Sequence, residues 1–314
     1  MDRNTGIRKT LWRWLAIPLA MSLIFGTLAS ESAAASYDPS KIDPALLARV
    51  LADPKADFDV IVRTTTTATS KGEREDRADR AGKAINAQGG KAKHALGIVG
   101  GASASIKGTH LLALTRSKLV AYVFSDDPFA ISFDPAAGAA KATATQATAI
   151  NATRVWSELG VTGRGIAVAV VDSGIAAHPD LGSRIVAAVD FTTPCAVTPC
   201  PAPAVSLVPL GDPGGHGTHV AGLIAGDGTS SGGATTGVAP NANVVDVRVI
   251  SASGTSNTST VLRGLQWVLA NRSTYNIRVV NMSLGRAPTT SYKQDPLATA
   301  AEVLIFAGIS VVVS

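Results

Sequence analysis

The stretch Ile166-Ala-Val-Ala-Val-Val-Asp172-Ser-Gly174 decides the fold of the C-terminal half of the chain. Its apolar residues form a continuous run, which is typical of a strand buried on both faces of a parallel sheet. Similar runs follow at residues 243–249 and 277–282, with helical patterns between them at residues 216–226 and 258–270. This alternation predicts an α/β domain, with a parallel sheet that carries helices on both faces.

Two residues in this half are candidates for catalysis. Asp172 directly follows the first strand, at the edge where parallel sheets collect functional groups. A carboxylate removed from water needs a partner, and a histidine ring N–H is suitable. His216, which glycines flank, can accept a proton near neutral pH. Two simpler interpretations exist: Asp172 caps a turn, or His216 and His219 hold a metal, although no carboxylate completes the usual zinc motif there.

These motifs resemble the aspartate and histidine signatures of the subtilases, the subtilisin-like serine proteases. The aspartate precedes the histidine in the chain, as it does in that family. The resemblance extends from about Ile150 to Ser314, so residues 150–314 are expected to form part of a subtilisin-like catalytic domain. The matching segments are Val168-Ala-Val-Val-Asp-Ser-Gly-Ile175, His178-Pro-Asp-Leu181, His216-Gly-Thr-His-Val-Ala-Gly222, Gly237-Val-Ala-Pro240 and Val280-Asn-Met-Ser-Leu-Gly285.

The resemblance implies a role for each matching site residue. Asp172 would orient His216 and support its charge, and His216 would act as the general base. Ser283, Leu284 and Gly285 would pair with the extended backbone of a protein or peptide substrate. The resemblance implies no required cofactor; it makes calcium a candidate stabilising ion, although no metal ligand is assigned.

The nucleophile of the family lies in a Gly-Thr-Ser-Met-Ala segment, which the 314 residues do not contain. The oxyanion-hole asparagine, which follows the strand that resembles residues 308–313, is also absent. The expectation is therefore a C-terminally truncated serine endopeptidase precursor that is inactive by itself. Two other functions stay open: a secreted inhibitor of the propeptide type, and a pseudoenzyme that binds peptides.

The N-terminus has the pattern of an export signal over residues 1–35. A basic start at Arg8, Lys9 and Arg13 precedes an apolar run and three alanines, Ala33 to Ala35. The apolar run, residues 15–29, is shorter than the roughly 20 residues that a membrane-spanning helix needs. The pattern predicts a secreted protein without a membrane anchor after cleavage. No basic stripe with interleaved aromatic residues follows, so a nucleic-acid partner is not expected.

The segment between the signal and the α/β domain has mixed periodicities. Residues 57–135 show strand and helix patterns in the order β-α-β-β-α-β, which predicts a small α+β sandwich of the ferredoxin-like type. By position and pattern, this segment resembles the inhibitory propeptide domain of subtilases, an expected partner of the catalytic domain. Residues 36–56 and 136–149 are expected to be linkers, and the second, composed of small residues, is suited to a processing cut.

The chain contains two cysteines, Cys195 and Cys200, in a proline-rich loop with four residues between them. An exported protein meets an oxidising compartment, where a short local disulfide is the expected state. A structural zinc site would need two more ligands, and no matching pair is present. We therefore expect a disulfide with a structural role.

Overall fold

The computed structural model describes residues 37–64, 70–130, 146–193, 200–285, 288 and 290–314. The chain divides into two units, Met1–Tyr37 and Asp38–Ser314, and the second unit carries the elements below. The predicted signal peptide and residues 136–145 of the predicted second linker lie outside the described residues. Among the described residues, no helix is both long and apolar enough to cross a membrane.

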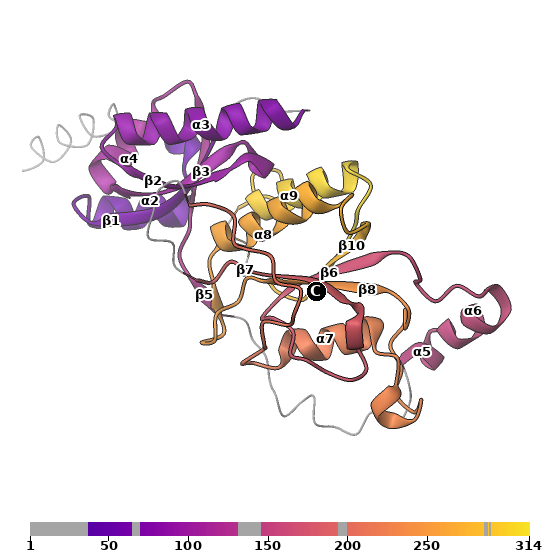
Figure 1. Ribbon diagram of the computed structural model, residues 1–314. Helices are drawn as coiled ribbons and strands as arrows, with labels where there is room; N and C mark the ends of the chain where they lie inside the picture. The colour runs from indigo at the N-terminus through magenta and orange to yellow at the C-terminus, as the bar shows by residue number, and fades with distance from the viewer. Residues whose placement is uncertain (1–36, 65–69, 131–145, 194–199, 286–287, 289) are drawn as a thin grey trace, which may run out of the picture. The chain divides into compact units, whose positions relative to one another are not determined.

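Residues 57–125 form an antiparallel sheet with two helices, in the predicted order β-α-β-β-α-β (Figure 1). The strands lie in the order β2-β3-β1-β4. The longer helix, α3, begins with a reciprocal capping box between Ser70 and Glu73. The elements are β1 Asp57–Thr64, α3 Lys71–Ala87, β2 Lys91–Leu96, β3 Gly101–Lys107, α4 Gly108–Thr115 and β4 Val120–Ser125.

The prediction of a linker over residues 36–56 is wrong for its middle part. Helix α2, Pro44–Ala52, begins there because Asp43 accepts hydrogen bonds from the first-turn amides and Pro44 fixes the first helical φ. Leu46 and Val50 are buried, and they pack into the same core as the sheet. We call residues 38–130 the N-terminal module, because α2 and the sheet share one core.

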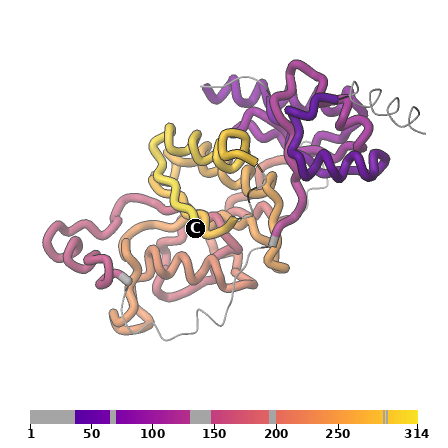
Figure 2. Tube along the Cα trace, turned by 180° about the vertical axis from the view of Figure 1, so that it is seen from behind, coloured from indigo at the N-terminus to yellow at the C-terminus, as the bar shows by residue number. Residues whose placement is uncertain are grey.

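The C-terminal half contains the predicted parallel sheet. Its order is β11-β10-β6-β8-β7, so β6 is the central strand. Its strands are β6 Ala167–Asp172, β7 Ile185–Asp190, β8 Asn243–Arg248, β10 Ile277–Met282 and β11 Ser310–Val313. Figure 2 shows the same chain from behind.

Helices cover both faces of the parallel sheet, as predicted (Figure 1). Helix α7, His216–Ala225, packs on one face with Val168 and Val170 of β6. Helices α8, Thr258–Asn271, and α9, Pro296–Phe306, pack on the other face with Ala167, Ala169 and Val171. Alternate residues of β6 thus enter two cores, which explains why its sequence is apolar without a break.

The remaining elements are short. Helices α5, Gln146–Ala149, and α6, Ala152–Leu159, precede the sheet, and Trp156 of α6 donates a hydrogen bond to the Val238 carbonyl. Strand β5, Phe129–Ala130, pairs antiparallel with β9, Thr255–Ser256. Single turns of 3-10 helix lie at Pro39–Lys41 (η1), Gly97–Val99 (η2), Gly182–Arg184 (η4) and Thr229–Ser231 (η5).

Candidate active site

Asp172 and His216 meet at the carboxyl edge of the parallel sheet. Asp172 is the last residue of β6, and His216 is the first residue of α7. His216 Nδ1 lies 2.7 Å from Asp172 Oδ1. The Asp172 side chain is fully buried, whereas 18% of the His216 side chain is exposed. A histidine that is held through Nδ1 in this way can use Nε2 to take a proton from a nucleophile.

Burial sets the electrostatics of this pair. Burial raises the pKa of Asp172, while the hydrogen bonds that it accepts from His216 and from the Ser173 amide act in the opposite direction. A buried carboxylate stabilises an imidazolium strongly, because little water screens the two charges. The pair is therefore arranged to support a positive charge on His216.

A polar network that the sequence interpretation missed joins the two residues. Ser173 Oγ donates to Asp212 Oδ1 and accepts from the Gly217 amide. Asp212 Oδ2 accepts from both the amide and the hydroxyl of Thr218. These contacts cap the first turn of α7, whose amide groups have no partner within the helix. The turn after Asp172 and the start of α7 are thereby tied together.

Gly217 allows the close approach of α7 to β6. A Cβ atom at this position would lie 2.2 Å from the Gly174 carbonyl oxygen and 3.2 Å from Asp172 Cβ. Gly174 itself has a φ of 106°, which side chains strongly disfavour. Both glycines are therefore required for the short distance between Asp172 and His216.

Comparison with known proteins identifies the family to which this arrangement belongs. Residues 163–314 match the sequence model of the subtilase family. Over these residues, which are just under half of the chain, the sequence is that of a subtilase. Serine protease AprX of Bacillus subtilis (strain 168) is 36% identical over 164 residues, which are 49% of this chain and 33% of AprX. Subtilisin E of the same organism is 29% identical over 299 residues, which are 95% of this chain and 65% of subtilisin E.

A solved structure supports the fold. Fervidolysin from Fervidobacterium pennivorans, described as a keratinolytic enzyme related to subtilisin, matches with a TM-score of 0.53 and 21% identity. The match covers 82% of this chain and 40% of fervidolysin. The chain thus spans between one third and two thirds of the length of these subtilase relatives.

The residues predicted to bind substrate follow β10 in this subtilase sheet. Strand β10 lies beside β6 in parallel, so Ser283, Leu284 and Gly285 lie at the same carboxyl edge as Asp172. Ser283 Oγ accepts a hydrogen bond from Asn281 Nδ2. The Leu284 side chain is 7% exposed and belongs to the core, which leaves its main chain for pairing with a peptide. Their role in substrate binding stays a prediction.

Two Gly-Thr-Ser sequences occur in the chain, but neither continues with Met-Ala as the subtilase nucleophile segment does. Ser230 lies on η5, where its amide donates to Asp180 Oδ1. Ser256 is buried on β9, and its hydroxyl donates to the Val249 carbonyl. Neither sequence therefore provides the nucleophile segment of the family.

The calcium and disulfide predictions are not tested by these contacts. Within the described ranges, no group of three or more His, Cys, Asp or Glu residues could hold a metal ion. Arg184 donates a hydrogen bond to the Asp180 carbonyl and forms an ion pair with Asp227. The guanidinium group of Arg184 therefore already supplies a positive charge beside these two residues. Cys195 lies outside the described residues, and its predicted bond to Cys200 stays a prediction; no described cysteine is free.

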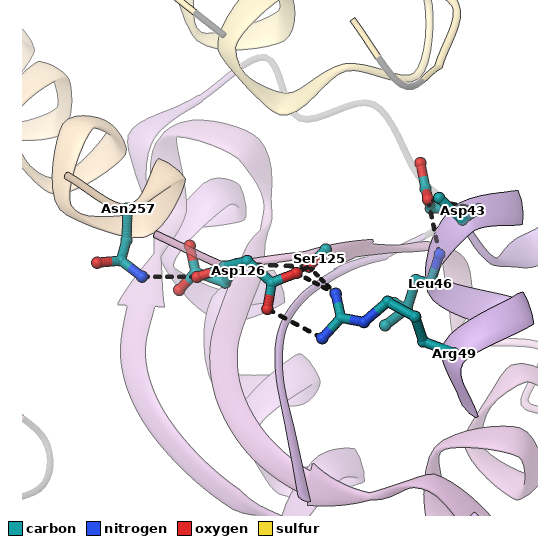
Figure 3. Close-up of polar contacts among 8 residues, drawn as sticks. Asp43, Leu46, Arg49, Ser125, Asp126 and Asn257 are labelled. Carbon is teal, nitrogen blue, oxygen red and sulfur yellow. Dashed lines mark hydrogen bonds and ion pairs between the residues drawn. The ribbon is translucent and has the colours of Figure 1, made fainter. Parts of the chain in front are cut away.

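The N-terminal module contacts the start of α8 through Asp126 (Figure 3). Asp126 Oδ1 accepts a hydrogen bond from the Ser259 amide, and the Asp126 carbonyl accepts one from Asn257 Nδ2. Asn257 is the N-cap residue of α8, but its own side chain makes no capping bond. A carboxylate from another part of the chain thus satisfies the first turn of α8.

Two further contacts join the N-terminal module to the same helix and to its preceding strand. The Ile98 amide donates to Gln266 Oε1 in the middle of α8. Strand β5 adds to β9 through the main chain, immediately before α8 begins. Apolar residues of both halves, among them Phe124 and Val261, belong to one core.

Proposed function

We propose that the chain is part of the precursor of a secreted serine endopeptidase, which hydrolyses peptide bonds by acyl transfer. The observation that carries this proposal is the 2.7 Å contact between His216 Nδ1 and Asp172 Oδ1 at the carboxyl edge of a subtilase sheet. His216 Nε2 takes the proton of a serine hydroxyl as that oxygen attacks the substrate carbonyl. Asp172 holds the ring in the required tautomer and stabilises the imidazolium that forms.

The serine in this proposal is not among the 314 residues, because they lack a Gly-Thr-Ser-Met-Ala segment. The polypeptide of these residues is therefore inactive by itself. Its substrates are proteins and peptides, which pair with the main chain at Ser283 to Gly285 by strand addition. Export follows from the signal pattern over residues 1–35.

The N-terminal module is an inhibitory propeptide in this proposal. Support comes from β5, which adds a strand to β9 in the way that extended peptides add to sheet edges. Further support comes from Asp126, which caps α8 and so connects the module to a helix that packs on the catalytic sheet. Inhibition in cis fits these contacts, because they lie within one chain.

A serine-reactive fluorophosphonate tests the proposed function. We first sequence the coding DNA and transcript beyond codon 314 and express the complete reading frame. Its product is expected to react with the probe and to cleave casein, whereas its His216→Ala variant and the 314-residue chain do neither. His219→Ala, three residues along the same helix and exposed, is the matched control and retains both reactions.

The opposite outcomes are equally clear. A frame that ends at codon 314, together with a 314-residue chain that inhibits other subtilases, would replace this proposal by the inhibitor function. A His216→Ala product that still reacts at the rate of the unaltered protein would remove His216 from the mechanism.

A further inference from the structure

Asp246 is a fully buried carboxyl group in the middle of β8. Its relative exposure is 0%, and acidic residues are almost never buried to this extent without a partner. Val245 and Val247 on either side enter the core beneath α8, so Asp246 lies on the α7 side of the sheet. In the strand register, Asp246 is beside Val170 and Arg248 is beside Asp172. The carboxyl group therefore lies one strand away from the candidate catalytic residues.

The contact of Asp246 is with the turn that follows Asp172. Asp246 Oδ2 accepts a hydrogen bond of 3.1 Å from the Ile175 amide. Ile175 is itself fully buried, and it ends the turn that begins with Ser173. Within the part of the chain that the structure describes, Asp246 Oδ1 is buried and has no hydrogen-bond partner.

Burial raises the pKa of Asp246 to about 8, and the nearby carboxylates of Asp212 and Asp190 act in the same direction. The hydrogen bond from Ile175 and the charge of Arg248 lower it. At neutral pH the group is therefore mostly uncharged, which makes its burial much less costly than burial of a carboxylate. Its oxygen still accepts from Ile175. Above pH 8 it adds a negative charge close to the Asp172–His216 pair.

We propose that Asp246 is a positioning residue for the Asp172–His216 pair, acting through the turn of residues 173–175. The turn is held from two sides: Ser173 ties it to α7, and Asp246 ties its end to β8. Loss of the second tie frees Ile175 and lets Asp172 move away from His216. The purpose of this positioning rests on the proposed function, but its test does not use catalysis.

The test follows the His216 imidazole by NMR in the 314-residue chain labelled with carbon-13 at histidine Cε1. The chain contains five histidines, and the signal that is absent from His216→Gln identifies the ring. Asp246→Leu removes the acceptor while filling the space. It is expected to change the Cε1 chemical shift of His216 at pH 7, because the ring loses part of its contact with the Asp172 carboxylate. Exchange of the Ile175 amide should become faster at the same time.

Two more variants separate positioning from charge. Asp246→Asn keeps an acceptor oxygen, so it is expected to retain the wild-type Cε1 chemical shift of His216 at pH 7 and to lose the chemical-shift step near pH 8 that ionisation of Asp246 causes. Asp190→Asn is the matched control: it removes a neighbouring charge that pairs with Arg248 but has no hydrogen bond to the turn. It should leave Ile175 exchange unchanged.

The proposal is overturned if folded Asp246→Leu shows the wild-type Cε1 chemical shift of His216 and slow exchange of the Ile175 amide. If Asp246→Leu does not fold, Asp246→Asn decides the question. A His216 chemical-shift step near pH 8 that persists in Asp246→Asn does not come from Asp246, and it overturns the proposal. Both results are independent of peptidase activity. Failure of the endopeptidase proposal, which the fluorophosphonate reaction measures, therefore remains distinguishable from failure of this one.

Discussion

Replacing Gly217 by alanine is expected to destabilise the C-terminal half by about 3 kcal/mol and to break the contact between Asp172 and His216. The added Cβ would lie 2.2 Å from the Gly174 carbonyl oxygen, a backbone atom that no side-chain rotation can move away. Relief requires α7 to shift away from the turn after Asp172. Urea unfolding and the His216 Cε1 shift measure the two effects.

Gly222 provides a matched control in the same helix. A Cβ atom there would meet nothing within 4 Å. Gly222→Ala is therefore expected to stabilise the chain by up to about 1 kcal/mol, because alanine favours a helix interior over glycine. If both alanine variants unfold at the same urea concentration, the close approach of α7 to the turn after Asp172 does not exclude a side chain at Gly217.

Replacing Asp126 by alanine is expected to cost about 2 kcal/mol at pH 5, through loss of the acceptor at the start of α8. The Ser259 amide would then be buried without its present partner. Asp127 is the neighbouring control, because its carboxylate is exposed and pairs with Arg49 at the surface. Asp127→Ala should cost less than about 1 kcal/mol. Urea unfolding and exchange of the Ser259 amide measure the difference.

The Asp126 contact also depends on pH, in a direction that its burial fixes. Burial raises the pKa of Asp126 from 3.8 to about 6, so the folded chain favours the protonated group. Its contribution to stability is therefore complete below pH 4 and is lost as the pH rises through 6. Asp126→Asn cannot ionise, so its stability relative to wild type should increase between pH 4 and 7, by at most about 3 kcal/mol.

The comparison between Asp126→Asn and wild type is needed because His94 changes the stability of the folded chain in the opposite direction as the pH rises. Burial, with the charge of Arg263, lowers the pKa of His94 to about 4. Its contribution is present above pH 6.5 and decreases as the pH falls toward 4. His94 is common to both proteins, so the difference between them isolates Asp126. A difference that does not change between pH 4 and 7 would contradict the assigned burial of Asp126.

The sequence predicts the parts of this fold that depend on local pattern. Strand β6 is apolar without a break because both of its faces are covered, and this pattern also places Asp172 at the sheet edge. The histidine motif then supplies the partner that a buried carboxylate needs. The contact of 2.7 Å between them follows from two glycines, Gly174 and Gly217, whose meeting is visible only in three dimensions.

The parts that were missed depend on contacts between distant residues or on weak local signals. Asp212 and Ser173 are 39 positions apart, and their hydrogen bond forms only when α7 packs beside β6. Asp246 carried a signal that was not used, a single acidic residue inside an apolar strand. Helix α2 also had one, since Asp43 followed by Pro44 is a typical helix start.

The contact between Asn257 and Asp126 has a consequence for the choice of expression host. Asn257-Thr258-Ser259 is an acceptor sequence for N-linked glycosylation. The nitrogen that would carry the sugar is the one that donates to the Asp126 carbonyl, in a partly buried place. A glycan on Asn257 and the docked N-terminal module therefore exclude each other. Only a host that leaves this asparagine unmodified, or folds the chain before modifying it, preserves the contact.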